Sequence, residues 1–144
     1  MDTKVKQLTT QQLIDQGVAL QAAGAVDSAR DIFQRVLERE PRNAAAHYSL
    51  GAIESGAGNY LQALKHIKHV VAGHPKFALA HLALSIVMFH LGELEKAQLA
   101  AESAVAEAPL VGDAHGSVAY KAQLLKVALP RAVQGALRRS RSHA

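Results

Sequence analysis

The stretch PRNAAAHYSLGAIESGAGNYLQALKHIKHVVAGHP, residues 41–75, decides the fold, because its landmarks return at the same interval before and after it. Each period closes with a proline, carries a glycine near its middle, and has an alanine shortly after that glycine. These landmarks are Pro41, Pro75 and Pro109; Gly24, Gly58 and Gly92; and Ala29, Ala63 and Ala97. A constant period of about 34 residues is typical of helical pairs stacked side by side. The sequence therefore predicts an all-α solenoid of antiparallel helix pairs.

Helix ends are marked by residues that start or stop a helix. Thr9 and Gln12 form the pattern of a capping box. The glycines tolerate the left-handed backbone that ends the first helix of each pair, and the prolines stop the second. These signals predict helices at 10–24, 26–40, 44–57, 60–72, 78–91 and 94–107. A seventh helix is expected at 113–128, and a short eighth fits 131–139.

Composition narrows the class of protein further. Hydrophobic residues make up 49% of the 144 positions and aromatic residues only 4%, so the helix formers Ala and Leu supply the apolar mass. The absence of cysteine excludes disulfides, thiolate metal sites and a catalytic cysteine. The first twelve residues contain no apolar run, and the longest apolar stretch, 78–88, is shorter than the about 20 residues that span a bilayer. We therefore expect no secretory signal and a cytoplasmic location.

Within each period the residue types resemble the tetratricopeptide repeat. That family pattern has an aromatic residue, Leu-Gly and Tyr on the first helix, then Ala, Phe, a small residue and Pro on the second. The corresponding residues are Leu13, Gln16, Gly17, Leu20, Ala29, Phe33, Val36 and Pro41; His47, Leu50, Gly51, Glu54, Ala63, Ile67, Val70 and Pro75; and His81, Leu84, Ser85, Met88, Ala97, Ala101, Ala104 and Pro109. Glu54 departs from the pattern, which has Tyr at that place. The small residues Gly17, Gly51 and Ser85 are expected to let the two helices of a pair approach closely.

The resemblance implies a right-handed superhelix and a division of the chain. Three repeats lie at 10–43, 44–77 and 78–111, after a lead-in at 1–9; a capping helix at 112–129 and a basic tail at 130–144 follow. The family's groove is concave and is lined by the first helix of each pair. Carried over to this chain, its partner-binding positions are Ile14, Val18, Tyr48, Ala52, Leu79, Leu82, Ile86 and Phe89, with Tyr120 continuing the surface on the capping helix.

The implied groove is mainly apolar, which favours an amphipathic helix or an extended peptide of a partner protein as its occupant. Two other interpretations remain open at this stage. Ordinary packing between neighbouring helices produces the same apolar pattern. The chain's own C-terminal segment, or a second copy of the chain, would also fill such a groove.

Eight histidines raise the question of a metal site. His47, His81 and His115 occupy equivalent repeat positions, too far apart for one ion, and are expected to fill the family's aromatic position half-buried. His66 and His69 lie three apart, but Lys65 and Lys68 beside them disfavour a cation, and a wet, weakly basic outer face is expected there. The sequence contains no phosphate loop, metal-ligand motif or nucleophile elbow. We therefore expect a protein that is not an enzyme and holds no metal or cofactor.

Charge is distributed unevenly along the chain. The net charge is +4, and residues 114–144 contain six Lys or Arg and no acid. The candidate residues for an anionic partner are Arg131, Arg138, Arg139 and Arg141. Three interpretations of this tail remain open, in this order: a solvated end, docking on acidic residues of the third repeat, and contact with an anionic membrane or a nucleic acid.

Three functions follow from these observations. The first is a non-enzymatic adaptor or assembly factor that binds a protein segment in the groove. The second is a structural subunit that homo-oligomerises through the apolar third repeat. The third is an accessory protein that contacts a membrane surface or a nucleic acid through the arginine tail.

Overall fold

The structure is a computed structural model that describes residues 7–107, and this part of the chain folds into six α-helices with no strand. The helices are α1 (Thr10–Ala22), α2 (Val26–Arg39), α3 (Ala44–Gly56), α4 (Tyr60–Gly73), α5 (Ala78–His90) and α6 (Leu94–Glu107). The predicted all-α solenoid is confirmed. The expected capping helix and arginine tail, with Tyr120, lie outside the described residues.

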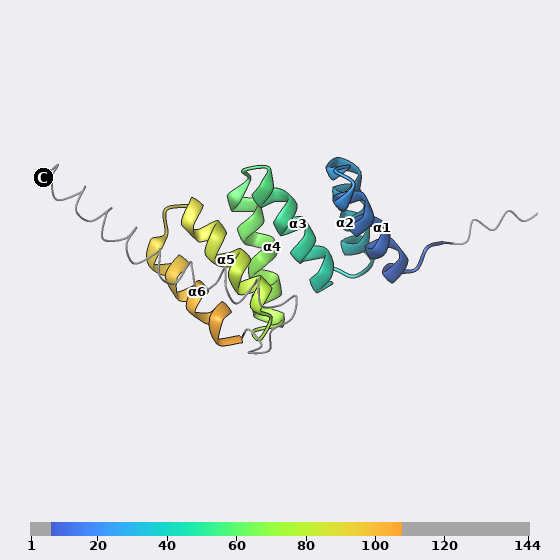
Figure 1. The fold of residues 1–144 in the computed structure, drawn as a ribbon. Helices are drawn as coiled ribbons and strands as arrows, with labels where there is room; N and C mark the ends of the chain where they lie inside the picture. Colours follow the sequence, from blue (N-terminus) through green and yellow to red (C-terminus); the bar gives the residue numbers. More distant parts are fainter. Residues whose placement is uncertain (1–6, 108–144) are drawn as a thin grey trace, which may run out of the picture.

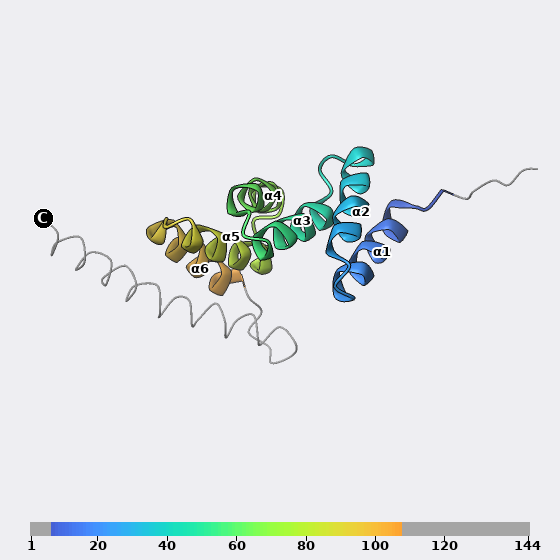
Figure 2. The ribbon, with the colours of Figure 1, turned by 90° about the horizontal axis from the view of Figure 1, so that it is seen from above.

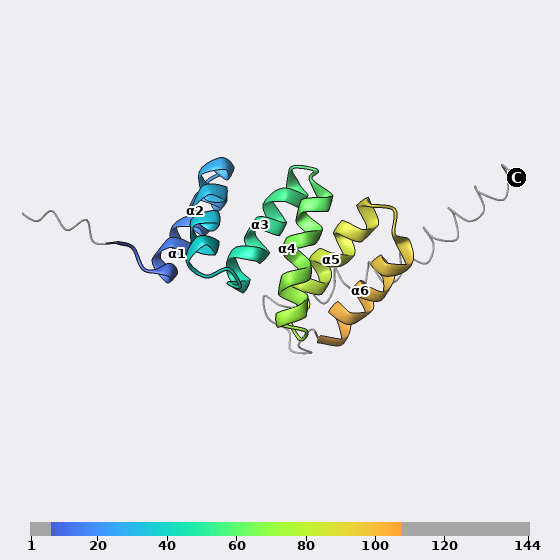
Figure 3. The same ribbon diagram turned by 180° about the vertical axis from the view of Figure 1, so that it is seen from behind.

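Three helix pairs follow one another in a row, with α1 and α2 at one end and α5 and α6 at the other (Figure 1). The two helices of each pair pack together, and α2 contacts α3 as α4 contacts α5. Figure 3 shows α4 between α3 and α5 from behind. From above, α4 is seen close to end-on while α5 runs across the view, so helix direction changes from pair to pair (Figure 2). The first helices also touch along the row, α1 with α3 and α3 with α5.

The helix ends follow the predicted signals. Thr9 Oγ1 accepts from the Gln12 backbone N–H at 3.1 Å, and Gln12 Oε1 accepts from the Thr9 N–H at 2.9 Å, which confirms the capping box. Gly24, Gly58 and Gly92 all adopt the left-handed backbone, with φ values of 82°, 83° and 81°. A residue with a Cβ would be strained at each of these turns.

In the first two pairs, the two helices meet where the first helix has a glycine. A Cβ built on Gly17 would lie 2.7 Å from Phe33 Cζ, and one on Gly51 would lie 2.5 Å from Ile67 Cδ1. Phe33 and Ile67 have no exposed surface, so neither can move aside freely. The predicted close approach is confirmed at these two positions.

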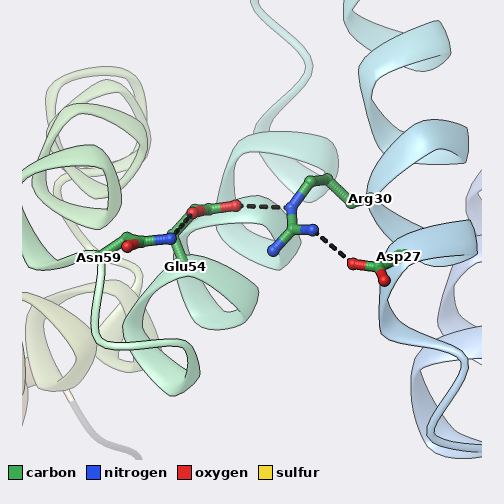
Figure 4. A network of polar contacts seen from close by, with 4 residues as sticks. All are labelled: Asp27, Arg30, Glu54 and Asn59. Carbon is green, nitrogen blue, oxygen red and sulfur yellow. Dashed lines mark hydrogen bonds and ion pairs between the residues drawn. The ribbon is translucent and has the colours of Figure 1, made fainter.

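A polar network joins the first two repeats (Figure 4). Glu54 of α3 accepts from Arg30 of α2 at 2.7 Å and from Asn59 at 2.8 Å, and Arg30 also donates to Asp27 at 2.8 Å. Glu54 is buried, so an unpaired carboxylate would be costly at this place. The departure of Glu54 from the family pattern is therefore explained by a contact between repeats.

His47 of α3 and His81 of α5 each fasten their helix to the proline turn before it. His47 Nε2 lies 2.8 Å from the Pro41 carbonyl oxygen, and His81 Nε2 lies 2.6 Å from the Pro75 carbonyl oxygen. Because a carbonyl only accepts, the Nε2 atom of each ring must carry the proton. These rings do fill the family's aromatic position, but they are buried rather than half-buried, because each makes this bond to a turn beneath the helix.

We predict that Gly51→Ala destabilises the fold by about 1–3 kcal/mol, because the new methyl group overlaps the buried Ile67 side chain. Gly56→Ala, in the same helix but with nothing within 4 Å of the new Cβ, should be neutral or stabilising by up to about 1 kcal/mol. Urea unfolding of both variants checks this. Equal effects of the two substitutions would contradict the packing explanation.

The pairing of Glu54 gives a second prediction. Burial raises the pKa of the Glu54 carboxyl, but the hydrogen bonds from Asn59 and Arg30 and the Arg30 charge outweigh it and leave that pKa below its ordinary value. Because the pKa of this carboxyl is lower in the folded than in the unfolded chain, its ionised form contributes stability. That contribution is complete above about pH 4.3, the ordinary Glu pKa, and is lost as the pH falls through the pKa of the folded state.

We therefore expect Glu54→Gln to be less stable than the wild type at pH 7, with the difference shrinking as the pH falls below about 4.3. Denaturant unfolding of both proteins between neutral and acidic pH measures this difference. A gap that stays constant over the whole range would contradict the assigned role of the carboxylate.

Candidate peptide-binding groove

A hollow of about 740 Å³ lies between the first two repeats. One wall is α1, through Ile14 and Val18, and the other is α3, through Ala44, Ala45, Tyr48 and Ser49. The turn between α4 and α5 completes it with Gly73, His74, Pro75, Lys76 and Phe77. We call this hollow the wide groove.

A second, smaller hollow continues from it along the third repeat. Its volume is about 220 Å³, and it lies between α3 and α5. Its lining residues are Tyr48, Gly51, Ala52, Ser55, Leu79, Leu82, Ala83, Ile86 and Val87. We call it the narrow groove. Tyr48 lines both hollows and therefore stands where they meet.

Tyr48 is held in place by an aromatic contact. Its ring centroid lies 5.4 Å from that of Phe77, with the planes tilted by 56°. Burial raises the pKa of the Tyr48 phenol, so its hydroxyl keeps its proton at neutral pH and can donate a hydrogen bond. Tyr48 thus offers a fixed apolar ring together with one polar atom.

Seven of the nine predicted partner-binding residues line these hollows. Ile14, Val18 and Tyr48 line the wide groove, and Ala52, Leu79, Leu82 and Ile86 line the narrow one. Phe89 is exposed but lines neither hollow, and Tyr120 lies outside the described residues. Whether these residues bind a partner stays a prediction.

Leu82 has a second role that sequence reasoning did not show. Only 8% of its surface is exposed, and it packs in a core cluster with Ala104 of α6. Ile86, one turn further along α5, is 38% exposed. Within the narrow groove, Ile86 is therefore the accessible side chain and Leu82 part of the wall behind it.

The turn between α4 and α5 was missed by sequence reasoning. The family resemblance places the groove on first helices only, so residues 73–77 were not predicted to line it. One signal was present: Phe77 occupies the same repeat position as Asn43, whose side chain caps α3 by accepting from Ala46. Phe77 makes no such cap on α5 and instead packs against Tyr48. An aromatic residue at a position where the preceding repeat has a capping residue was thus the signal that this position has a role other than capping.

The chemistry of the groove is that of an apolar binding surface. Among its lining residues Lys76 is the only one with a permanent charge, and His74 stands beside it in the same turn. Serines, the Tyr48 hydroxyl and backbone groups supply the remaining polar atoms. Such a surface suits hydrophobic side chains of a bound segment, with a few polar groups to orient it.

The histidines of the middle repeat are arranged differently from the expected outer face. His66 is half-buried, and its Nδ1 lies 3.0 Å from Nδ1 of the buried His47. The exposed His69 ring stacks on His47, with centroids 4.5 Å apart. The prediction of a wet surface thus holds for Lys65 and His69 and is wrong for His66, because α4 turns that ring toward α3. Residues 7–107 contain no group of three metal-binding side chains that could hold an ion.

Comparison with known families gives a consistent result. Two sequence models described as tetratricopeptide repeat match residues 14–54 and 55–119. The chain belongs to the tetratricopeptide repeat family. A comparison with curated proteins found no match.

Solved structures extend the likeness over most of the chain. PcrH from Pseudomonas aeruginosa is 25% identical, with a TM-score of 0.77 over 90% of this chain and 99% of PcrH. PcrH in complex with the chaperone binding region of PopD is also 25% identical, with a TM-score of 0.78 over 88% and 97%. SycD, a type III secretion translocator chaperone of Yersinia enterocolitica, is 14% identical with a TM-score of 0.80 over 91% and 92%, which shows the fold alone.

In the part of the chain that the structure describes, no helix combines the length and the apolar character needed to cross a membrane.

The contrast between Leu82 and Ile86 is testable. Leu82→Glu should destabilise the fold by at least about 3 kcal/mol, because it places an unpaired carboxylate in the core. Ile86→Glu should cost about 1 kcal/mol or less, because that side chain reaches solvent. Circular dichroism and urea unfolding measure both. Equal losses would show that Ile86 belongs to the core rather than to the groove.

Proposed function

We propose that this protein is a non-enzymatic adaptor or chaperone that holds a segment of a partner protein in the wide and narrow grooves. Tyr48, at the junction of the two, is the central contact. Val18 and Ile86 are the apolar contacts on either side of it, one from the first repeat and one from the third.

The observation that carries this proposal is the continuity of an apolar groove across all three repeats. Its walls are first helices, which also touch one another along the row, together with the turn at residues 73–77. Val18 is half exposed and Ile86 partly so, although both are hydrophobic. Apolar side chains that remain open to solvent within a hollow are typical of a surface that a partner covers.

The likeness to PcrH supports the same proposal. PcrH matches this chain over nearly its full length and has been solved with the chaperone binding region of PopD. We propose a partner of the same general kind for this chain, namely a segment of another protein. The residues that would contact that segment are assigned from the groove of this chain and not from PcrH.

The test uses two double variants with matched chemistry. Val18→Glu with Ile86→Glu places two charges in the groove. Leu61→Glu with Leu99→Glu places two charges on hydrophobic residues that are 68% and 63% exposed and line neither groove. A random peptide library is displayed and selected against the wild type, and the affinities of the recovered peptides are then measured by calorimetry.

We expect the groove variant to weaken binding at least about tenfold, or about 1.4 kcal/mol, while the control variant binds like the wild type. Circular dichroism confirms that both variants are folded. The proposal is wrong if no peptide is recovered, or if the control variant loses as much affinity as the groove variant.

A further inference from the structure

Three histidines of the middle repeat meet between α3 and α4. His47 Nε2 lies 2.8 Å from the Pro41 carbonyl, and His47 Nδ1 lies 3.0 Å from His66 Nδ1. The His69 ring stacks on the His47 ring, with centroids 4.5 Å apart and 12° between the planes. We call these three residues the histidine cluster. Nothing in the proposed binding of a segment requires it, so its arrangement calls for its own explanation.

Hydrogen-bond chemistry fixes where the protons lie. The Pro41 carbonyl only accepts, so neutral His47 carries its proton on Nε2 and has a bare Nδ1. That bare nitrogen accepts from His66, which must therefore carry its proton on Nδ1. The geometry thus assigns one tautomer to each ring.

This arrangement accepts one additional proton but not two. A proton added to His66 Nε2 leaves the donation from His66 Nδ1 to His47 Nδ1 intact. A second proton, on His47 Nδ1, would point the N–H groups of two positively charged rings at each other, with 3.0 Å between the two nitrogens. Neither nitrogen could then accept, so the contact between α3 and α4 would have to open.

The charged and titratable groups around the cluster do not offset this repulsion. Glu54 of α3 is the acid that acts on His66, but it is already bonded to Arg30 and Asn59. Lys65 and Lys68 of α4 add positive charge nearby on the exposed side. Arg42 and His74, from the turns on either side of the cluster, line a hollow together with His69 and bring no negative charge. The histidines of α5 are engaged elsewhere: His81 with the Pro75 carbonyl and His90 with the Tyr60 ring.

The cluster connects the walls of the wide groove. His47 precedes Tyr48 on α3, and its bond to Pro41 fixes the turn that joins the first repeat to the second. His66 and His69 lie on α4, which leads into the groove turn at residues 73–77. A change at the cluster therefore acts on α3 and on both turns that position the groove.

We propose that the histidine cluster is a pH-sensitive latch that keeps the groove formed at neutral pH and loosens it when both His47 and His66 are protonated. The part of this inference that concerns regulation rests on the proposed function, because the groove that the latch controls is the proposed binding site.

The expected direction of the pH dependence follows from the linkage between proton binding and folding. Burial lowers the pKa of His66, the neighbouring His47 lowers it further, and Glu54 opposes them only in part. The unfolded chain therefore binds more protons below about pH 6.5, the ordinary His pKa, so stability falls as the pH drops through that value and levels off below the folded pKa. Groove affinity should fall with it, by up to about tenfold per pH unit for each proton that binding excludes.

The test begins with the wild-type chain and needs no partner. Nitrogen NMR of ¹⁵N-labelled histidine reads the tautomers, and we expect the proton on Nδ1 for His66 and on Nε2 for His47. Labelled tyrosine then follows the Tyr48 ring, assigned through Tyr48→Phe, from pH 8 to pH 5. We expect the Tyr48 signal to shift together with the His47 and His66 signals.

His66→Asn is the decisive variant, because the Asn amide can still donate to His47 but cannot take up a proton. The Tyr48 shift below pH 7 should disappear in it. His90→Asn removes a histidine outside the cluster and should leave the Tyr48 titration unchanged. Circular dichroism at pH 7.5 checks that both variants are folded, and if His66→Asn does not fold, the wild-type tautomers and the Tyr48 titration decide.

Opposite tautomers, a Tyr48 signal that does not titrate, or a titration that persists in His66→Asn would overturn the latch. Peptides recovered with the groove add a second readout: their affinity should fall between pH 7.5 and pH 5.5 in the wild type and much less in His66→Asn. Loss of all peptide binding would contradict the proposed function, whereas the pH dependence of the Tyr48 signal would still test the latch. The two failures are therefore distinguishable.

Discussion

The contact between a glycine on the first helix of a pair and a large side chain on the second is the constraint on which the structure depends. At Gly17 and Gly51 the facing side chain occupies the space where a Cβ would stand. The two helices can therefore approach until Phe33 or Ile67 is fully buried. Each of these first two pairs is thereby a rigid unit that can be stacked on the next, and a stack of rigid units has a groove of defined shape.

Polar contacts fix how one helix pair packs against the next. Arg30 and Glu54 join the first repeat to the second, and the bond from His47 to Pro41 fixes the turn between them. A buried carboxylate and a buried imidazole are costly unless every partner is in place, so these contacts hold the repeats in one arrangement. The same arrangement lets Tyr48 face α1 on one side and α5 on the other.

Much of this fold could be predicted from the sequence, because its signals are local. A glycine at a helix end or a threonine at a helix start acts on the few residues around it, and the glycine and proline signals return in every repeat. Contacts between distant residues were not predictable in this way. Glu54 lies 24 positions from Arg30, and His66 lies 19 from His47, so neither pairing shows in any short pattern. Leu82 was ambiguous for another reason: α5 is apolar on all sides, so periodicity does not tell which side faces α6.

The central claim is that an apolar groove around Tyr48 binds a segment of a partner protein. A crystal structure of the chain with a peptide selected for binding tests it most directly. The account predicts that the peptide lies along α1, α3 and α5, in contact with Tyr48 and the turn at residues 73–77. A peptide bound instead to the outer faces of α2, α4 or α6, with the groove empty, would contradict it.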